Sequence, residues 1–490
     1  MSHLLKRTIS LLVALVLLFT PLLSVIANAA DYKADCPYIF VHGFMGTDIY
    51  VDPDDPDSKT AWPPDGDAIK TAVKEALPHL LKFIFFRNHK ELGDKLFPIA
   101  DKLFAPIYLD DDGNVPNKSG VRFEYPDKDS IKKSSQLSFV YDWRLTPMET
   151  AAKLNDFIDY VLEASGSEQV VIECHSYGGV ICNTYARLYG TSKVRSLLFN
   201  STAVYGETYT GDLMLGKMAF NADAITAYLT GAVDYNKNDS GLIALFNALK
   251  ISGLTGVICT MFNHILLEIG PQPIAEALLK LFGRWHSIWA MIPDEMIDEA
   301  YDYIFNDIYK NDPTDRSVMQ GKIKDYNENI RAYKADTMKL INDTSNLYIV
   351  SRYGYSAFFL TPSWQNASDM IIDVKYNSYG ATAADYGKTL TDEQMKGVDA
   401  KYISPDKTVN ASTCMFPEQT WFVRHISHGT YPDSIKRMDK ILLYYDGQAT
   451  VDTFSDFPRF LYFDEDTKLI VPDTLYDVKL SLKDKFKKNK

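Results

Sequence analysis

Residues 169–180 read QVVIECHSYGGV, an apolar strand pattern that leads into Ser176 and then into two glycines and a helical pattern. A serine on such a sharp strand-to-helix turn exposes its hydroxyl group. The backbone N–H of the next residue, Tyr177, then lies at a helix N-terminus, where developing negative charge is stabilised. Cys174 occupies the position two residues before the serine, where this turn usually has glycine. The run predicts a nucleophilic serine on a strand-to-helix turn of an α/β protein.

The segments before the serine predict further strands and one well-capped helix. Short apolar runs at residues 37–41 and 137–141 are typical of strands buried on both faces of a mostly parallel sheet. Thr146 predicts the N-cap of a helix, Pro147 its first residue and Glu149 its capping-box partner. Further strands are predicted at residues 193–200 and 347–351. This order favours an α/β fold with helices on both faces of the sheet.

Two long insertions interrupt the alternation of strands and helices, at about residues 47–134 and 203–346. The second is strongly helical and too long for a simple crossover. Its segment 241–270 is apolar but contains polar and charged residues, which argues against a membrane span. We expect either amphipathic cap or lid helices or an ordinary helical subdomain. The main domain is then expected at residues 30–445, and 446–490 form a small β extension with a basic tail.

Residues 1–29 have the pattern of a secretory signal peptide. Lys6 and Arg7 precede an apolar run, and the small residues at 27–29 offer a cleavage site, so the protein is expected to be secreted. An uncleaved membrane anchor is the alternative. Cleavage after Ala29 removes two basic residues and no acidic one, which changes the net charge from −13 to −15. This acidity argues against nucleic acid as a partner and against electrostatic docking on anionic membranes.

The five cysteines are spaced without any C-x-x-C motif, and no ligand cluster predicts a metal or another cofactor. Cys174 and Cys182 lie on the predicted strand and helix around the serine, so we expect reduced core residues. A disulfide between Cys36 and Cys414 is left open. A structural calcium ion in the aspartate-rich loops near Asp52 or at residues 110–112 is also left open.

A serine hydroxyl needs a histidine as general base, and that histidine needs a carboxylate that sets its tautomer. On a turn of this kind the chain order is serine, acid, histidine. We prefer His428 to His425 as the base, because a glycine and a predicted helix follow it directly. For the acid we prefer Asp369, in a turn before an apolar segment, with Asp373 and Asp385 as alternatives.

An oxyanion formed at the serine would need two backbone N–H donors. Tyr177 supplies one by its position in the turn. The second is expected from Phe44, because it follows the first predicted strand in the run HGFMG at residues 42–46. His42 in the same run is expected to be a hydrogen-bonded structural residue.

With these segments in order, the chain resembles the lecithin:cholesterol acyltransferase family, a branch of the α/β-hydrolases that includes lysosomal phospholipase A2. The resemblance lies in four segments: HGFMG at 42–46, Trp62-Pro63, FVYDWRLTP at 139–147 and HSYGG at 175–179. It implies the α/β-hydrolase fold with a large helical cap, and an acyl-enzyme intermediate on Ser176. Asp142 and Arg144 would be structural, with the arginine bracing the oxyanion loop. The chain departs from the pattern at Cys174, at Met370 (where many lipases have glycine after the acid) and in its helical insertion.

These observations together predict a secreted serine lipase or phospholipase of bacterial type that acts on glycerolipid esters, with O-acyltransferase activity where an alcohol accepts the acyl group. The partners expected are a lipid or ester substrate and a transient membrane or micelle interface, without nucleic acid. A soluble carboxylesterase acting on short esters is one alternative. A non-catalytic secreted binding protein on a hydrolase scaffold is the other.

Overall fold

The computed structural model describes residues 32–86, 88–218, 221–235 and 281–473, with the single positions 256, 259, 260, 263 and 279. The predicted signal peptide, the basic C-terminal tail and nearly all of the apolar segment 241–270 lie outside the described residues.

Eight strands form one sheet in the order β14-β13-β12-β7-β6-β5-β1-β4. Every neighbouring pair is parallel except β13 and β14. The strands are β1 (Tyr38–Val41), β4 (Gln136–Phe139), β5 (Val170–Ser176), β6 (Val194–Thr202), β7 (Asn346–Tyr353), β12 (Thr420–Arg424), β13 (Phe460–Asp464) and β14 (Leu469–Pro472). The strands predicted around the serine are present, and the two strands that follow residue 445 extend the edge of this main sheet.

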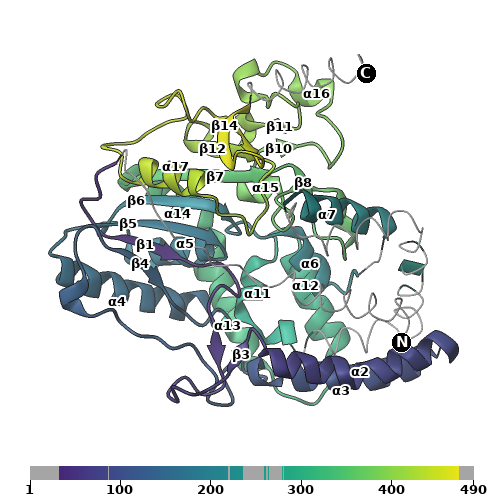
Figure 1. Cartoon of the computed structure of the whole chain (residues 1–490). Helices are drawn as coiled ribbons and strands as arrows, with labels where there is room; N and C mark the ends of the chain where they lie inside the picture. Colours follow the sequence, from purple (N-terminus) through teal and green to yellow (C-terminus); the bar gives the residue numbers. More distant parts are fainter. Residues whose placement is uncertain are drawn as a thin grey trace.

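Helices cover both faces of the sheet because its strands are apolar on both sides (Figure 1). In β5, Ile172 and Cys174 face a core shared with α4 (Pro147–Ser165) and α5 (Gly178–Tyr189). Val171, between them, faces a second core shared with α17 (Asp433–Leu443). This alternation is the two-residue period of a strand that is buried on both faces.

The predicted helix cap before the serine is confirmed. Thr146 is the N-cap of α4, and its hydroxyl accepts a hydrogen bond from the backbone N–H of Glu149 at 3.2 Å. In return the Glu149 carboxylate accepts from the backbone N–H of Thr146 at 3.1 Å. The cap sets the point where α4 starts and returns the chain to β5, which carries the serine.

The remaining helices and small sheets lie in the insertions and in the connection from β7 to β12. The first insertion contains β2 (Ile49–Tyr50), β3 (Thr60–Trp62), α2 (Gly66–Phe86) and α3 (His89–Phe104). The second contains α6 (Thr208–Met214), α7 (Ala222–Tyr235), α11 (His286–Met291), α12 (Ile297–Asp302), α13 (Ser317–Asn329) and α14 (Lys334–Thr344). The connection contains β8 (Tyr355–Ser356), β9 (Ala367–Ser368), α15 (Val374–Asn377), β10 (Thr382–Ala383), α16 (Asp392–Met395) and β11 (Val409–Asn410). Figure 1 shows α6, α7 and α12 gathered to the right of the sheet.

All five cysteines are unpaired. The disulfide left open between Cys36 and Cys414 does not form, because the two residues pack in separate apolar clusters. Cys174 and Cys182 are buried thiols, as predicted. The Sγ of Cys174 points into the core, 3.4 Å from the carbonyl oxygen of Leu198. The core thus accommodates a side chain at the position where this turn usually has glycine.

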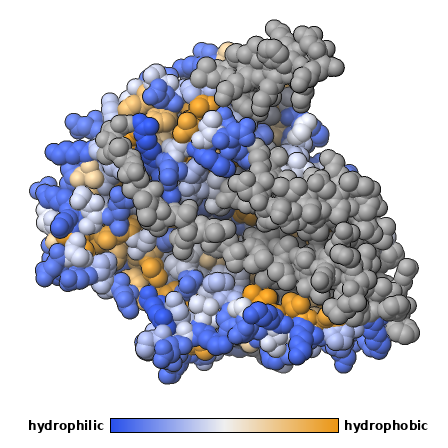
Figure 2. Space-filling view, viewed as in Figure 1, coloured by the Kyte–Doolittle hydropathy of each residue, from blue (hydrophilic) through white to orange (hydrophobic). Residues whose placement is uncertain are grey.

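The described surface is mainly hydrophilic on the face shown in Figure 2, where hydrophobic residues form separate patches. No helix within the described ranges is long and apolar enough to cross a membrane. The apolar side chains of this part of the chain are mostly inside, in the cores on the two faces of the sheet.

Candidate active site

Ser176 is the last residue of β5, and its backbone has a φ of 56°, in the left-handed region. This conformation is costly for a residue with a side chain, and strain of this kind concentrates at functional sites. Helix α5 follows after one residue, with Tyr177 at its N-cap. The turn therefore has the shape predicted from the sequence, with the serine at its tip and the helix N-terminus beside it.

The two glycines after the serine are required by close packing. A Cβ atom on Gly178 would lie 2.3 Å from the carbonyl oxygen of Val41, at the end of β1. A Cβ atom on Gly179 would lie 2.4 Å from the Cβ of Thr202, at the end of β6. The start of α5 is thus pressed against both neighbouring strands, which fixes the serine between them.

The HGFMG loop lies against the serine. A Cβ atom on Gly43 would lie 2.6 Å from the Cβ of Ser176 and 3.1 Å from its Oγ. Phe44 follows directly, with its ring against Trp143 at 4.9 Å between ring centroids. The loop thus meets the serine at Gly43, next to Phe44 in the chain, and the roles of the Phe44 and Tyr177 N–H groups as oxyanion donors stay predictions.

Tyr141 and Trp143 hold this loop in place. The hydroxyl of Tyr141 donates to the carbonyl oxygen of His42 at 2.6 Å, and the Nε1 of Trp143 donates to the carbonyl oxygen of Thr47 at 3.1 Å. Burial lowers the pKa of His42 to about 4, so its imidazole is neutral near neutral pH. The ring of His42 packs against that of Phe40, with 4.8 Å between ring centroids, and its role as a hydrogen-bonded structural residue stays a prediction.

Arg144 braces a different segment from the one expected. It is completely buried, and its guanidinium binds the carboxylate of Asp142 at 2.6 Å and 2.9 Å. Its remaining hydrogen bonds go to the hydroxyl and the carbonyl oxygen of Ser119, both at 3.1 Å. The arginine therefore fastens the first insertion to the end of β4, and the contacts to the oxyanion loop come from its neighbours.

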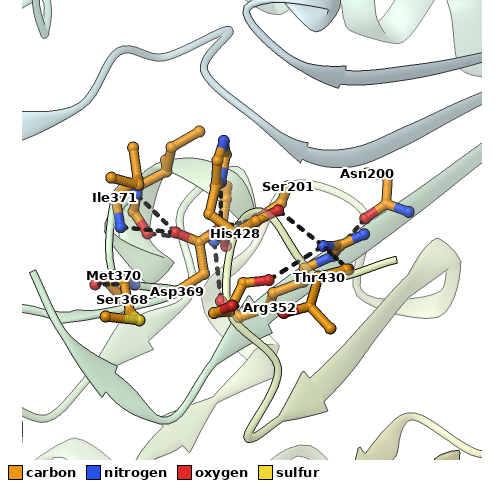
Figure 3. A network of polar contacts seen from close by, with 12 residues as sticks. Asn200, Ser201, Arg352, Ser368, Asp369, Met370, Ile371, His428 and Thr430 are labelled. Atoms are coloured by element: carbon orange, nitrogen blue, oxygen red, sulfur yellow. Dashed lines mark hydrogen bonds and ion pairs between the residues drawn. The ribbon is translucent and has the colours of Figure 1, made fainter. Parts of the chain in front are cut away.

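His428 and Asp369 form a direct pair (Figure 3). The Nδ1 of His428 lies 2.7 Å from Oδ2 of Asp369, and the backbone N–H of His428 donates to the carbonyl oxygen of Asp369 at 2.8 Å. The carboxylate side chain is 0% exposed and the imidazole is 14% exposed. A buried carboxylate on Nδ1 sets the tautomer that leaves Nε2 as a proton acceptor.

Three further groups donate hydrogen bonds to the Asp369 carboxylate. Its Oδ1 accepts from the backbone N–H groups of Ile371 and Ile372 at 3.0 and 2.8 Å, and its Oδ2 also accepts from the hydroxyl of Ser201. Burial alone would raise the pKa of Asp369, but the charge and hydrogen bond of His428, together with those of Ser201 and Ile372, lower it below its ordinary value. The carboxylate therefore stays ionised beside the histidine.

The alternative residues lie elsewhere. The ring of His425 packs against Tyr462, with 5.2 Å between ring centroids. Asp373 accepts hydrogen bonds from the first residue of α6, where it caps that helix. Asp385 forms an ion pair with Lys388 at 2.8 Å. The described geometry thus joins the preferred histidine to the preferred acid, and neither to an alternative.

Two strands bring this pair to the serine. Ser176 is in register with Thr202 of β6, next to Ser201, whose hydroxyl binds Asp369. The ring of His175 lies against that of His428, with 4.5 Å between centroids. The ends of β5 and β6 and the loop after β12 therefore converge at one place.

Among the described residues, no group of three histidine, cysteine or acidic side chains is arranged to hold a metal ion. In the aspartate-rich loops, Asp52 forms an ion pair with Lys118 at 2.9 Å. Asp110 accepts from the backbone N–H groups of Asp112 and Asn114 at 3.0 and 2.8 Å.

Glu207, at the start of α6, is a buried carboxyl near the site, and its pKa predicts a pH effect on stability. Burial, the largest cause, raises this pKa from 4.5 to about 8, and the charges of Asp373 and Asp369 add to the shift. The folded state then binds more protons than the unfolded state between about pH 4.5 and 8, so stability falls as pH rises through that range. Glu207→Gln is expected to raise Tm above that of the wild type at about pH 8 and to leave it nearly unchanged at about pH 4, as measured by thermal unfolding. An equal effect at both pH values would contradict the shift.

Sequence reasoning missed two residues that contact the pair, Ser201 and Arg352. No sequence motif distinguishes Ser201 from the other residues near the end of its strand. Arg352 could have been identified from the sequence, because it is a charged residue inside the apolar run 347–353 and a buried charge must have partners.

Comparison with known families matches residues 126–223 to a family described as the alpha/beta hydrolase fold. The matched segment runs from just before β4 through α4, the serine turn, α5 and β6. With the eight-stranded, mostly parallel sheet and the helices around it, this match shows that the fold is that of the α/β-hydrolases.

The more specific resemblance to the lecithin:cholesterol acyltransferase family stays a prediction. A search of the curated proteins gives no match. A similar solved structure, described as the Tle4-Tli4 complex, shares 14% sequence identity, with 36% of this chain and 48% of that chain covered. The chain thus spans about half of that structure's length, and the TM-score of 0.21 is too low to support any argument.

Proposed function

We propose that this protein is a serine hydrolase that acts on the acyl esters of glycerolipids through an acyl-enzyme intermediate on Ser176. The observation that supports this most strongly is the combination of Ser176 on a left-handed turn with the buried pair of Asp369 and His428 beside it. The proposal includes secretion, which rests on the signal-like pattern of residues 1–29.

In the proposed reaction, Oγ of Ser176 attacks the ester carbonyl carbon while Nε2 of His428 takes the hydroxyl proton. The N–H groups of Tyr177 and Phe44 stabilise the oxyanion of the tetrahedral intermediate, and Asp369 stabilises the imidazolium. His428 then gives its proton to the leaving alcohol. Water or a second alcohol attacks the acyl-enzyme with His428 again as base, which releases a fatty acid or a new ester.

An apolar cluster beside the acid supports a lipid substrate. Met370 follows Asp369 directly and packs with Tyr355, Phe358 and Tyr228, the last of which lies on α7 of the second insertion. A Cβ atom on Gly231 of α7 would lie 2.7 Å from the ring of Tyr355. The insertion therefore packs on the loop that carries the acid, and we propose that the acyl chain of the substrate would bind beside this apolar cluster.

The test is to incubate the protein with phosphatidylcholine vesicles that contain a long-chain alcohol, beside the Ser176→Ala variant, and to quantify the lipid products. We expect free fatty acid and lysophospholipid to appear with the wild type and to stay at background with the variant. An acylated alcohol in addition would establish transfer to alcohols.

A second set of substrates separates the alternatives. If Ser176-dependent turnover occurs only with short soluble esters and does not increase with micelles, the protein is a carboxylesterase and the lipid part of the proposal is wrong. If no ester of either kind gives a Ser176-dependent product, the proposal of a hydrolase is wrong, and a non-catalytic binding role replaces it.

A further inference from the structure

Arg352 lies in β7 and is completely buried. Its Nη1 donates to the carbonyl oxygens of Ser427, His428 and Thr430, at 3.3, 3.0 and 2.7 Å. Three carbonyl groups of one short loop therefore converge on a single side chain, and this loop carries His428 (Figure 3).

The same loop is fixed by contacts of its own and by the acid. The backbone N–H of Thr430 donates to the carbonyl oxygen of Ser427 at 3.0 Å, and the hydroxyls of these two residues lie 2.5 Å apart. From the other side, Asp369 accepts from both the backbone N–H and the Nδ1 of His428. Arg352 adds a side-chain link from this loop to β7, which lies between β6 and β12 in the central sheet.

A buried guanidinium needs a counter-charge, and two buried carboxyls supply it. The Oδ1 of Asn200 accepts from Nε of Arg352 at 2.8 Å, and its Nδ2 donates to Glu173 at 3.4 Å and to Asp439 at 2.9 Å. Burial raises the pKa of both carboxyls, and the charge of Glu173 adds to the shift of Asp439. The charge of Arg352 opposes these shifts in both carboxyls, so the guanidinium and the two acids form one buried electrostatic network.

We propose that Arg352 is a positioning residue for the reaction, and that it fixes the loop 427–430 so that His428 is held against Asp369 and directed toward Ser176. The proposal rests on the proposed function of Ser176 and His428. Charge balance alone would require only the contacts of Arg352 with the network of the two carboxyls. The hydrogen bonds to three carbonyl groups of the loop that carries His428 are additional, and they indicate a positioning role.

Two variants separate positioning from charge balance. Arg352→Met removes the donors and leaves the carboxyl pair without its counter-charge, so Tm should fall. Arg352→Met/Glu173→Gln also removes one carboxyl, so the remaining Asp439 can stay protonated and much of the lost Tm should return. The double variant is nevertheless expected to lose about 100-fold in kcat, because a misplaced base slows proton transfer. KM should stay within about twofold, because Arg352 does not touch substrate.

A matched control is Arg424→Met. Arg424 is a largely buried arginine on the neighbouring strand β12, and its guanidinium pairs with Asp473 at 2.5 Å. This variant should lower Tm while kcat of the folded protein stays near that of the wild type. A second readout needs no substrate: the NMR resonance of the proton on Nδ1 of His428 should be present in the wild type and in Arg424→Met, and lost or shifted in the double variant.

The outcomes are distinct. A double variant with the wild-type kcat, or with an unshifted resonance, overturns the proposal and leaves Arg352 a charge-balancing residue. A wild type without Ser176-dependent turnover, beside a double variant that has lost the resonance, overturns the proposed function and leaves the positioning role standing.

If the double variant does not fold, Arg352→Lys replaces it, with kcat expected about tenfold lower because one ammonium cannot reproduce the guanidinium fork. An unchanged kcat in that variant likewise overturns the proposal.

Discussion

Replacing Ser176 with alanine is expected to lower kcat for ester hydrolysis by about 10⁵- to 10⁶-fold, to the level that binding and oxyanion donors alone provide. The reason is that the reaction loses its nucleophile, and the neighbouring hydroxyl of Ser201 cannot replace it because it donates to Asp369. The measurement is the initial rate at saturating substrate, with the product quantified directly so that a slow residual rate is still detected.

The same substitution should change stability very little. Alanine has the same Cβ as serine, so the strain of a φ of 56° stays the same, and the free energy of unfolding should change by less than about 1 kcal/mol. Ser176→Gly should be equally inactive but more stable than the wild type, because glycine adopts the left-handed region without strain. A glycine variant with lower Tm than the alanine variant would contradict a strained turn.

Cys174→Ala serves as the control for the nucleophile. Cys174 lies in the same strand, but its thiol is fully buried in the core and burial raises its pKa well above the ordinary value. We expect this variant to keep wild-type kcat with some loss of Tm. If Ser176→Ala kept more than a tenth of the activity and Cys174→Ala lost it, the assignment of the nucleophile would be wrong.

The sequence predicted those parts of the fold whose signals are local. The strand pattern, the two glycines after Ser176 and the capping box of Thr146 can each be recognised within a short segment of sequence, and the structure contains all of them. A helix cap or a tight turn is decided by a single hydrogen bond or a single close contact, so it can be predicted from one sequence alone.

The predictions that were wrong, or that left alternatives open, concern contacts between residues far apart in the chain. Asp369 and Asp373 could not be separated by pattern, and only the packed loop shows that the first meets His428 while the second caps α6. Arg144 was expected to brace the oxyanion loop, but its guanidinium binds Asp142, two residues before it, and Ser119, in an insertion whose path no local signal predicts. The network of Arg352 joins three strands, one helix and one loop, and the sequence shows only its charge.

Replacing Asp369 with asparagine is expected to lower kcat by about 10⁴-fold at neutral pH, the second-largest effect after that of the serine. An amide can turn its N–H₂ toward Nδ1 of His428, which favours the wrong tautomer, and it cannot stabilise the imidazolium that forms during the reaction. The loss should appear in kcat more than in KM, since Asp369 is buried behind the histidine and does not meet substrate.

The pH dependence of stability gives an independent check on this carboxylate. The pKa of Asp369 is lower in the folded protein than its ordinary value, so its contribution to stability is present above that ordinary value and is lost as pH falls through the folded pKa. The difference in Tm between the wild type and Asp369→Asn should therefore be largest near neutral pH and shrink in acid. A constant difference over the whole range would show that the carboxylate gains nothing from ionisation.

Asp373→Asn is the matched control, because Asp373 lies four residues further along the chain and is equally buried. It contacts the start of α6, and burial raises its pKa, the opposite direction from Asp369. Its replacement should leave kcat near that of the wild type. Any gain in Tm should appear at pH values above the ordinary pKa of an aspartate, where the wild-type carboxyl is ionised in the unfolded chain and must be protonated on folding. If Asp373→Asn lost 10⁴-fold in kcat and Asp369→Asn did not, the acid would have been assigned to the wrong aspartate, despite the 2.7 Å contact between Asp369 and His428.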